Sequence, residues 1–218
     1  MFKRKGVLLT FILLFALSLS ACGANKPEEK AYNYLEKAAA NEEDFNKAQE
    51  PLVKEEQKEQ DLYEKIMKLN TSKRDQIVEY SDQALKSIDK RKKLIDQEKK
   101  SIDDAYHTFK KALSPLKEAG KNKGQSHVNA LIQAMEDRFH AYESLYKAYG
   151  DSITNDQKLF NLLKEKDISI ESLQQQLDKV NGSYKKIDTL KATFNQYTKT
   201  FNREKKAFYK AYGLSGGK

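Results

Sequence analysis

Apolar residues recur every seven positions over long stretches of this chain, and this repeat constrains the fold more than any other feature. In one segment, Ile88, Ile95, Ile102, Phe109 and Leu116 occupy the same position of successive heptads. Seven residues are almost two turns of α-helix, so these side chains line one helical face. The pattern predicts long helices that pack side by side through narrow apolar seams.

The same spacing occurs in the other segments. A helix predicted to begin at Ser126 carries Ile132, Phe139, Tyr146, Ile153 and Phe160, and a later one carries Leu173, Val180, Ile187, Phe194, Phe201 and Phe208. The first segment, from Tyr34 to Leu69, is less regular, with Glu55 and Glu59 as weak points. No segment alternates polar and apolar residues with a period of two, so we place no strands.

The segment around Ile88 has a second, mixed rank of seam residues. This rank consists of Ala84, Arg91, Glu98, Ala105 and Ala112. One apolar and one mixed rank fit packing within a bundle better than an isolated two-stranded coiled coil.

Short polar stretches separate the helical segments. We predict turns at residues 70–72, 120–124 and 166–168, and a bend near Glu50 caused by Pro51. Four segments joined by short turns predict an all-α fold, a long antiparallel up-and-down bundle of four helices. The alternative is a three-helix, spectrin-like rod, if the region around Pro51 separates from the body.

The N-terminal region has the layout of an export signal. A basic cap at residues 3–5 precedes an apolar run, Val7 to Leu19, which is short for a membrane-spanning helix. The run ends in Leu19, Ser20, Ala21 and Cys22, which resembles a bacterial lipobox and implies a diacylglyceryl group on the Cys22 thiol. Cys22 is the chain's only cysteine.

These features predict four regions. They are a lipoprotein signal peptide (1–21), the acylated cysteine with a short linker (22–27), the helical bundle (28–213) and a frayed tail (214–218). They also predict a protein on the outer face of the cytoplasmic membrane, held by a lipid and facing the cell wall.

Catalytic and metal-binding patterns are missing from the sequence. His140 lies near Glu136 and Glu143, but a di-metal helical site needs a Glu-x-x-His motif on each of two helices. We therefore expect no enzyme activity, no metal and no cofactor.

Two groups of basic residues are candidate contacts for anionic polymers or lipid headgroups. They are Lys90, Arg91, Lys92 and Lys93, and the pair Lys121 and Lys123, in a chain of formal net charge +8. Export removes nucleic acid as a partner, which leaves peptidoglycan or teichoic acid outside the cell. The alternative is that these residues only form a solvated helical surface. A repeated tyrosine pattern, at 145–150 and 208–213, is interpreted as core packing.

Two stretches resemble the YkyA-like cell-wall-binding lipoproteins of Gram-positive bacteria. One contains Leu35, Glu36, Glu43, Phe45, Gln49, Pro51, Leu52, Glu59, Leu62, Tyr63 and Ile66, and the other runs from Asp89 to Leu94 and continues to Glu98 and Ile102. The resemblance implies an extracytoplasmic helical lipoprotein with a wall-binding role, and it carries over no catalytic or ligand residues. The predicted function is a binding or spacer module without catalytic activity. The alternative is a structural scaffold or chaperone-like partner of exported proteins.

Overall fold

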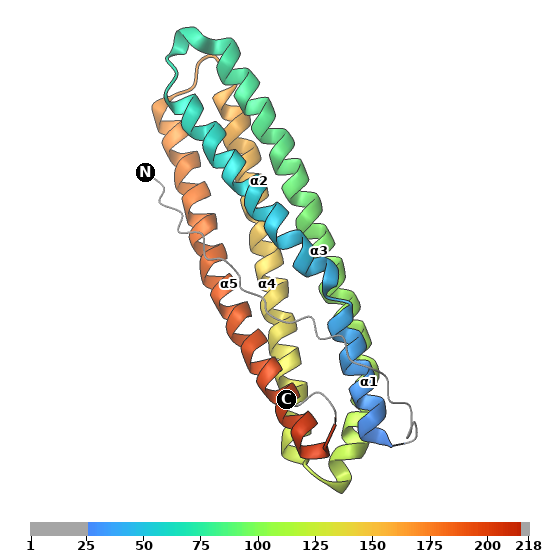
Figure 1. Cartoon of the computed structure of the whole chain (residues 1–218). Helices are drawn as coiled ribbons and strands as arrows, with labels where there is room; N and C mark the ends of the chain where they lie inside the picture. The colour runs from blue at the N-terminus through green and yellow to red at the C-terminus, as the bar shows by residue number, and fades with distance from the viewer. Residues whose placement is uncertain (1–25, 215–218) are drawn as a thin grey trace.

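The computed structural model describes residues 26–214, which form four long helical segments lying side by side in a rod (Figure 1). The elements are α1 (Pro27–Ala40), α2 (Glu43–Met67), a short 3₁₀ turn η1 (Thr71–Lys73), α3 (Arg74–Asn122), α4 (Gln125–Leu163) and α5 (Ile170–Tyr212). The described residues contain no strand. The prediction of an all-α fold with four long segments is therefore confirmed. At 1.5 Å per residue, the 49 residues of α3 extend for about 74 Å.

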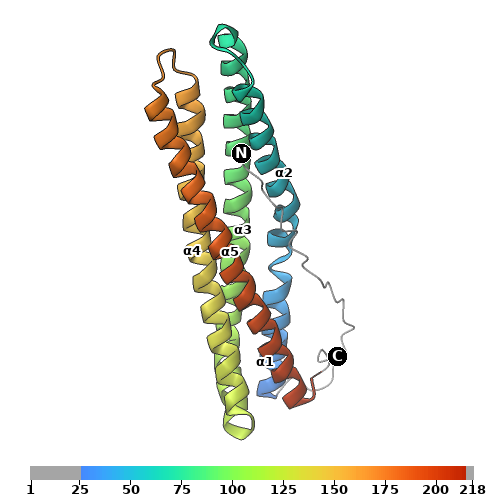
Figure 2. The same ribbon diagram turned by 90° about the vertical axis from the view of Figure 1, so that its left-hand side faces the viewer.

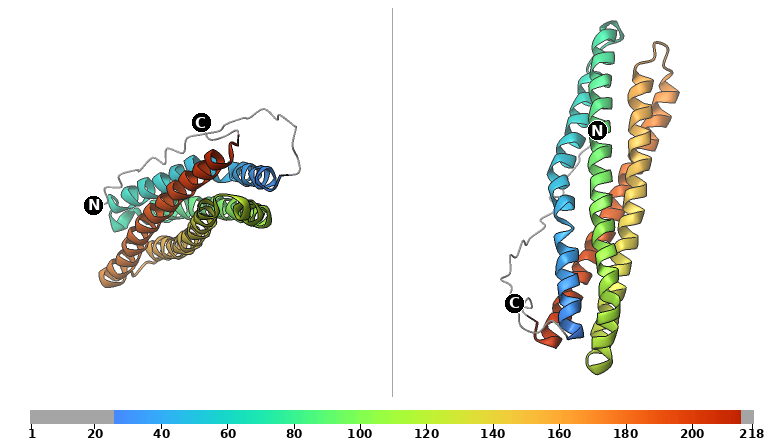
Figure 3. Two further views of the ribbon diagram at one scale, coloured as in Figure 1. Left: turned by 90° about the horizontal axis from the view of Figure 1, so that it is seen from below. Right: turned by 90° about the vertical axis from the view of Figure 1, so that its right-hand side faces the viewer.

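The rod consists of two helical hairpins. In one, α1 and α2 pack in succession along α3, and in the other α4 packs against α5, while the contact of α3 with α4 joins the two hairpins. Figure 2 shows α5 crossing α4 obliquely, so that its last turns lie beside α1. There the rings of Tyr32 and Tyr209 are 4.9 Å apart between centroids. Towards the other end the hairpins diverge (Figure 2; Figure 3, right).

The two ends of the rod are formed by different chain segments. The start of α1, the α3–α4 turn and the end of α5 share one end, which we call the proximal end (Figure 1). The α2–α3 and α4–α5 turns lie at the opposite, distal end.

Three apolar clusters follow one another along the rod. The proximal cluster includes Phe109, Leu116, Leu131 and Phe208, the middle one Phe45, Ile95, Tyr142 and Phe194, and the distal one Leu62, Ile88, Phe160 and Val180. Each cluster draws side chains from both hairpins. Burial of each such side chain contributes roughly 1.5–3 kcal/mol relative to exposure, so the seams hold the rod together.

The first segment is interrupted between α1 and α2, and not at Pro51. At the break, the Ser101 hydroxyl donates to the Asn41 carbonyl (2.6 Å) and accepts from the Phe45 amide (3.1 Å). α2 continues through Pro51, so the helix does not restart there, and the bend predicted near Glu50 stays a prediction. Pro51 removes the amide donor to the carbonyl of Lys47, and both residues are exposed.

The predicted turns lie within a few residues of the observed ones. Asn70 caps η1 by accepting from the Ser72 amide (3.2 Å), and Ser169 caps α5 in the same way from Ser172 (3.0 Å). Gly124 adopts φ +73° between α3 and α4, a conformation that favours glycine.

The chain's predicted lipobox lies outside the described residues. Leu19, Ser20, Ala21 and Cys22 belong to this part, as do the signal peptide and most of the predicted linker. Within residues 26–214, every helix is too polar or too short to cross a bilayer.

Candidate functional site

Arg91 is buried at the centre of the distal half of the rod. Its guanidinium has no exposed surface and contacts Asp156 of α4 at 2.5 Å and Glu59 of α2 at 3.2 Å. The hydroxyl of Tyr184 on α5 binds the same Asp156 carboxylate at 2.6 Å. The prediction that Arg91 contacts an external polymer is therefore wrong. Arg91 occupies a seam position, where α2, α4 and α5 supply its partners.

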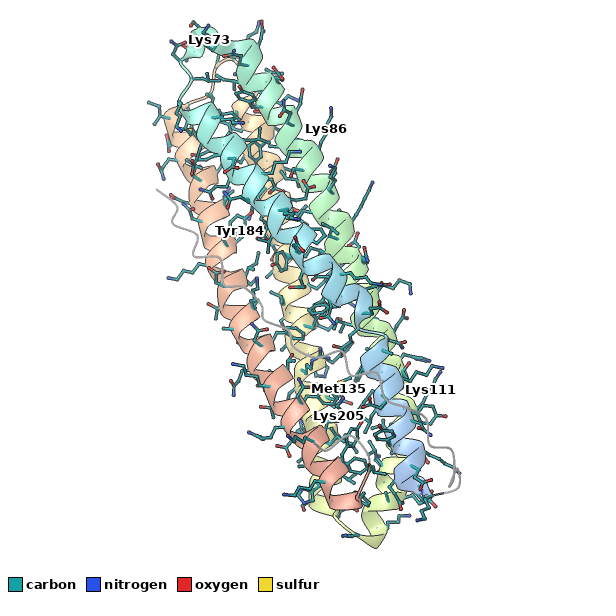
Figure 4. The ribbon with its side chains drawn as sticks, in the orientation of Figure 1. Lys73, Lys86, Lys111, Met135, Tyr184 and Lys205 are labelled. Atoms are coloured by element: carbon teal, nitrogen blue, oxygen red, sulfur yellow. The ribbon has the colours of Figure 1, made fainter. Side chains whose placement is uncertain are left out.

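A small hollow lies beside this cluster. It is lined by α2, α4 and α5, specifically by Glu59, Gln60, Tyr63, Asp156, Leu159, Phe160, Leu177, Val180 and Tyr184. Figure 4 shows Tyr184 in the space between α5 and α2. The hollow holds about 50 Å³, far below the few hundred Å³ that enclose a drug-sized ligand. We call it the distal hollow.

The other residues of the 90–93 run are on the surface, and two of them are neutralised. Lys92 pairs with Asp96 at 2.6 Å, and Lys90 lies 3.7 Å from Glu55. Lys93 is exposed and has no ion-pair partner within 4.0 Å among residues 26–214. Because exposed pairs of this kind largely cancel their own charge, the run presents little net positive field.

Lys121 and Lys123 lie at the proximal end, in and just after the last turn of α3. Both are exposed, and neither has an ion-pair partner in the described part of the chain. The Tyr212 hydroxyl donates to the Lys123 carbonyl and so ties the end of α5 to this turn. The two predicted basic groups are therefore about half the rod's length apart and do not form one surface.

Glu98 is a second buried ionisable residue. The Gln49 amide donates to it at 2.5 Å, and the Tyr142 hydroxyl lies at 3.5 Å. Burial raises the pKa of Glu98 to about 8, an effect that Glu56 strengthens and Lys191 opposes. At neutral pH the carboxyl group is therefore mostly protonated, and it joins α2, α3 and α4 as a neutral hydrogen-bonding group.

Arg138 of α4 forms the third buried polar contact between the hairpins. Its two terminal nitrogens each donate to one oxygen of Glu42 at 2.7 Å, and Nε donates to Thr198 at 3.0 Å. The guanidinium also lies over the ring of Phe194 at 5.1 Å. This bidentate pair connects the α1–α2 break to α4 and α5.

Sequence reasoning missed Arg138 and Asp156, although a signal for both was present. Buried residues of α4 step by three and four along the chain: Val128, Leu131, Met135, Arg138, Tyr142, Leu145, Tyr149, Ser152, Asp156, Leu159 and Leu163. The predicted seam combines the rank of Ile132, which is only partly buried, with the apolar rank of Val128, Met135, Tyr142, Tyr149 and Leu163. Asp156 occupies the heptad position of the Val128 rank between Tyr149 and Leu163, and Arg138 lies seven residues after the buried Leu131, so both positions predict burial.

The remaining candidates are structural or exposed. His140 is exposed, 4.0 Å from Glu136, and residues 26–214 contain no group of three or more potential metal ligands. Tyr149 and Tyr209 are buried, which confirms core packing for these members of the repeated pattern.

The fold places this protein in the class of slender helical rods. Buried ionisable side chains of one helix pair with those of another. Comparison with known proteins then gives the family. The chain matches the YkyA family, described as "Putative cell-wall binding lipoprotein", over residues 26–211. The chain therefore belongs to the YkyA family of lipoproteins.

A curated relative supports the same assignment. It is the "Uncharacterized lipoprotein YkyA" of Bacillus subtilis (strain 168), 32% identical over 211 residues, which cover 97% of this chain and 95% of the relative. A crystal structure of a conserved protein of unknown function from Staphylococcus aureus is similar in fold. It has a TM-score of 0.72 and 17% identity, covering 84% of this chain and 93% of that one.

Proposed function

We propose that this protein is a non-catalytic spacer and wall-binding module, held by a lipid on the outer face of the cytoplasmic membrane of a Gram-positive cell. The observation that carries the proposal is the rod itself. The first described residue, Lys26, lies at one end, and the distal turns lie about 70 Å away. A chain tethered at that end extends its helical sides into the space that wall polymers occupy.

The outer side of α3 supplies a surface for an anionic polymer. Lys86, Lys93 and Lys111 are exposed, and none has an ion-pair partner within 4.0 Å in the described chain. Lys86 and Lys111 project from this side of the rod in Figure 4. Ammonium groups spaced along a helix attract the repeated phosphates of teichoic acid, and salt weakens that attraction.

The interior supports a role without catalysis. Arg91, Glu98 and Arg138 are engaged by partners from other helices, so each joins helices together. The distal hollow is too small to enclose a substrate of ordinary size.

Sedimentation with purified cell walls tests the proposal. The non-acylated chain should sediment with walls that carry teichoic acid, and lose most of this binding when the teichoic acid is removed or the salt is raised. Lys86→Gln, Lys93→Gln and Lys111→Gln together should weaken binding several-fold. The matched control replaces three exposed lysines of α5, Lys179, Lys185 and Lys199, and should bind normally. Equal binding by walls with and without teichoic acid contradicts the polymer contact.

A second candidate function is a scaffold or chaperone-like role for exported proteins. It is favoured by apolar side chains exposed near the distal end, with Met67 at 51% and Ile170 at 88% exposure. Under this proposal the chain binds no wall preparation but slows the aggregation of an unfolded exported protein. Ile170→Lys should then abolish the effect on aggregation, whereas Val53→Lys, on the exposed side of α2, should not.

A further inference from the structure

The structure brings lysines from three distant parts of the chain together at the proximal end. They come from the start of α1, from the α3–α4 turn and from the last turns of α5. Seven of them are exposed: Lys26, Lys30, Lys117, Lys121, Lys123, Lys206 and Lys210. We call this group the proximal lysine cap.

The lysines of the cap are not neutralised by the protein. None of the seven has an ion-pair partner within 4.0 Å among residues 26–214, whereas Lys92, Lys99 and Lys100 in the middle of the rod pair with aspartates four residues later. Three glutamates share the proximal segments, and two of them, Glu28 and Glu29, are only partly exposed. The third, Glu118, is exposed beside Lys117 and Lys121, so the cap keeps a formal net charge of +4 from its seven lysines and three glutamates.

The cap also lies next to the predicted attachment point. Lys26 lies four positions after Cys22, and four fully extended residue steps span about 14 Å at most. The lipid anchor therefore holds this end of the rod against the bilayer surface. Charges within about 8 Å of an anionic surface are attracted to it at physiological salt.

We propose that the proximal lysine cap is a headgroup-binding surface that holds the base of the rod against anionic lipids. The inference rests on the lipid anchor but not on wall binding, so either can fail without the other. A lipid chain alone leaves the rod free to tilt and rotate about its tether. Contacts from three separate segments around the base limit that freedom and keep the distal end pointing away from the membrane.

The distal end provides a matched control for this proposal. Its turns carry exposed lysines as well, including Lys68, Lys73 and Lys166, but Asp75, Glu165, Asp167 and Glu171 lie among them. Lys73 marks this end in Figure 4. If any exposed lysines could bind lipid, both ends would do so.

Vesicle sedimentation of the chain from residue 22 onwards, with Cys22→Ser, tests the inference. This chain keeps every described residue and lacks the lipid. It should bind phosphatidylglycerol vesicles and not phosphatidylcholine vesicles, and binding should fall as salt rises. Replacing Lys121, Lys123, Lys206 and Lys210 by Gln should weaken binding at least about tenfold. Replacing the distal Lys68, Lys73, Lys158 and Lys166 by Gln should change it less than about twofold, with circular dichroism verifying both folds.

Three results would overturn the inference. The first is that the wild-type chain binds phosphatidylglycerol and phosphatidylcholine vesicles equally. The second is that the proximal and the distal Lys→Gln substitutions weaken vesicle binding equally. The third concerns soluble polyglycerol phosphate as an alternative source of phosphates. If the proximal set loses binding to this polymer but keeps binding to vesicles, the cap is a polymer site and not a headgroup site.

Discussion

Single charged residues in the seams of this rod are buried together with a partner from another helix. Arg91 is paired with Glu59 and Asp156, and Arg138 with Glu42. Removing one member of such a set leaves the other charge in an apolar environment, which costs far more than an exposed pair contributes.

Arg91→Met should destabilise the protein by about 3–5 kcal/mol, because it strands two carboxylates in the core. Urea unfolding followed by circular dichroism measures the change. Lys92→Met is the control: it removes the neighbouring exposed lysine and its pair with Asp96, and should change stability by less than about 1 kcal/mol. Equal stability of the two variants would contradict the role given to Arg91.

The stability of the rod should fall as pH rises towards 8, because of Glu98. The folded state raises the pKa of Glu98 to about 8 from its ordinary value of 4.5, mainly through burial. Between these values the folded state holds the proton more tightly than the unfolded state does. The stability that Glu98 contributes is therefore fully present below about pH 4.5 and is lost as the pH rises to about 8. The steepest slope from this group is about 1.4 kcal/mol per pH unit.

Glu98→Gln should remove this slope while keeping a hydrogen-bonding group beside Gln49 and Tyr142. Thermal unfolding of both proteins from pH 5 to 9 makes the comparison. If the wild type and the variant share the same pH profile, Glu98 is not the group that titrates.

At the scale of the helices, regular structure persists through residues of poor helix propensity. Gly150 and Gly182 lie inside α4 and α5, and a Cβ added at either position meets no atom within 4 Å. Tertiary packing of the seams holds these turns in place although glycine favours the unfolded chain.

Gly150→Ala and Gly182→Ala should therefore each stabilise the protein by roughly 0.5–1 kcal/mol. Gly124→Ala is the opposing case. It places a side chain at φ +73° and 3.3 Å from the Tyr212 hydroxyl oxygen, and should destabilise the α3–α4 turn. Denaturant midpoints measure all three changes, and a gain of stability in Gly124→Ala would contradict the turn geometry.

At the scale of the whole molecule, the two hairpins are packed more closely at the proximal than at the distal end. Near the distal end they diverge (Figure 2). Beyond the distal apolar cluster they are joined by polar contacts, such as Lys164 to Asp82 at 2.6 Å and Arg74 to the Leu163 carbonyl at 2.9 Å. The first turns of α5 are largely exposed, whereas Phe201, Phe208 and Tyr209 near its end are buried.

Amide hydrogen exchange should therefore be faster in the first two turns of α5 than around Phe201 to Tyr209, because local opening follows the density of buried contacts. Mass spectrometry of peptides from the two regions measures the difference. The last turn, next to Gly213, serves as the reference for ordinary end fraying. Uniform protection along α5 would show that the hairpins separate only in global unfolding.

Much of this fold could be predicted from the sequence because helix type and buried face are local properties. The heptads of α3 correctly predict which of its residues are buried. These include the mixed rank of Ala84, Arg91 and Glu98. The turns were visible as short polar stretches. The break at Asn41 was not, because it depends on a hydroxyl of Ser101, sixty residues away in the chain.

The sequence by itself determined that this protein is a set of long helices with continuous seams, since a seven-residue period needs no knowledge of a neighbour. Only the tertiary structure decided which helix lies opposite each seam. That choice gave Arg91, already on a predicted seam, its partners Glu59 and Asp156, and it gave Arg138 its carboxylate from Glu42. The physical reason is that the burial of a charge depends on which groups of other helices meet it in space.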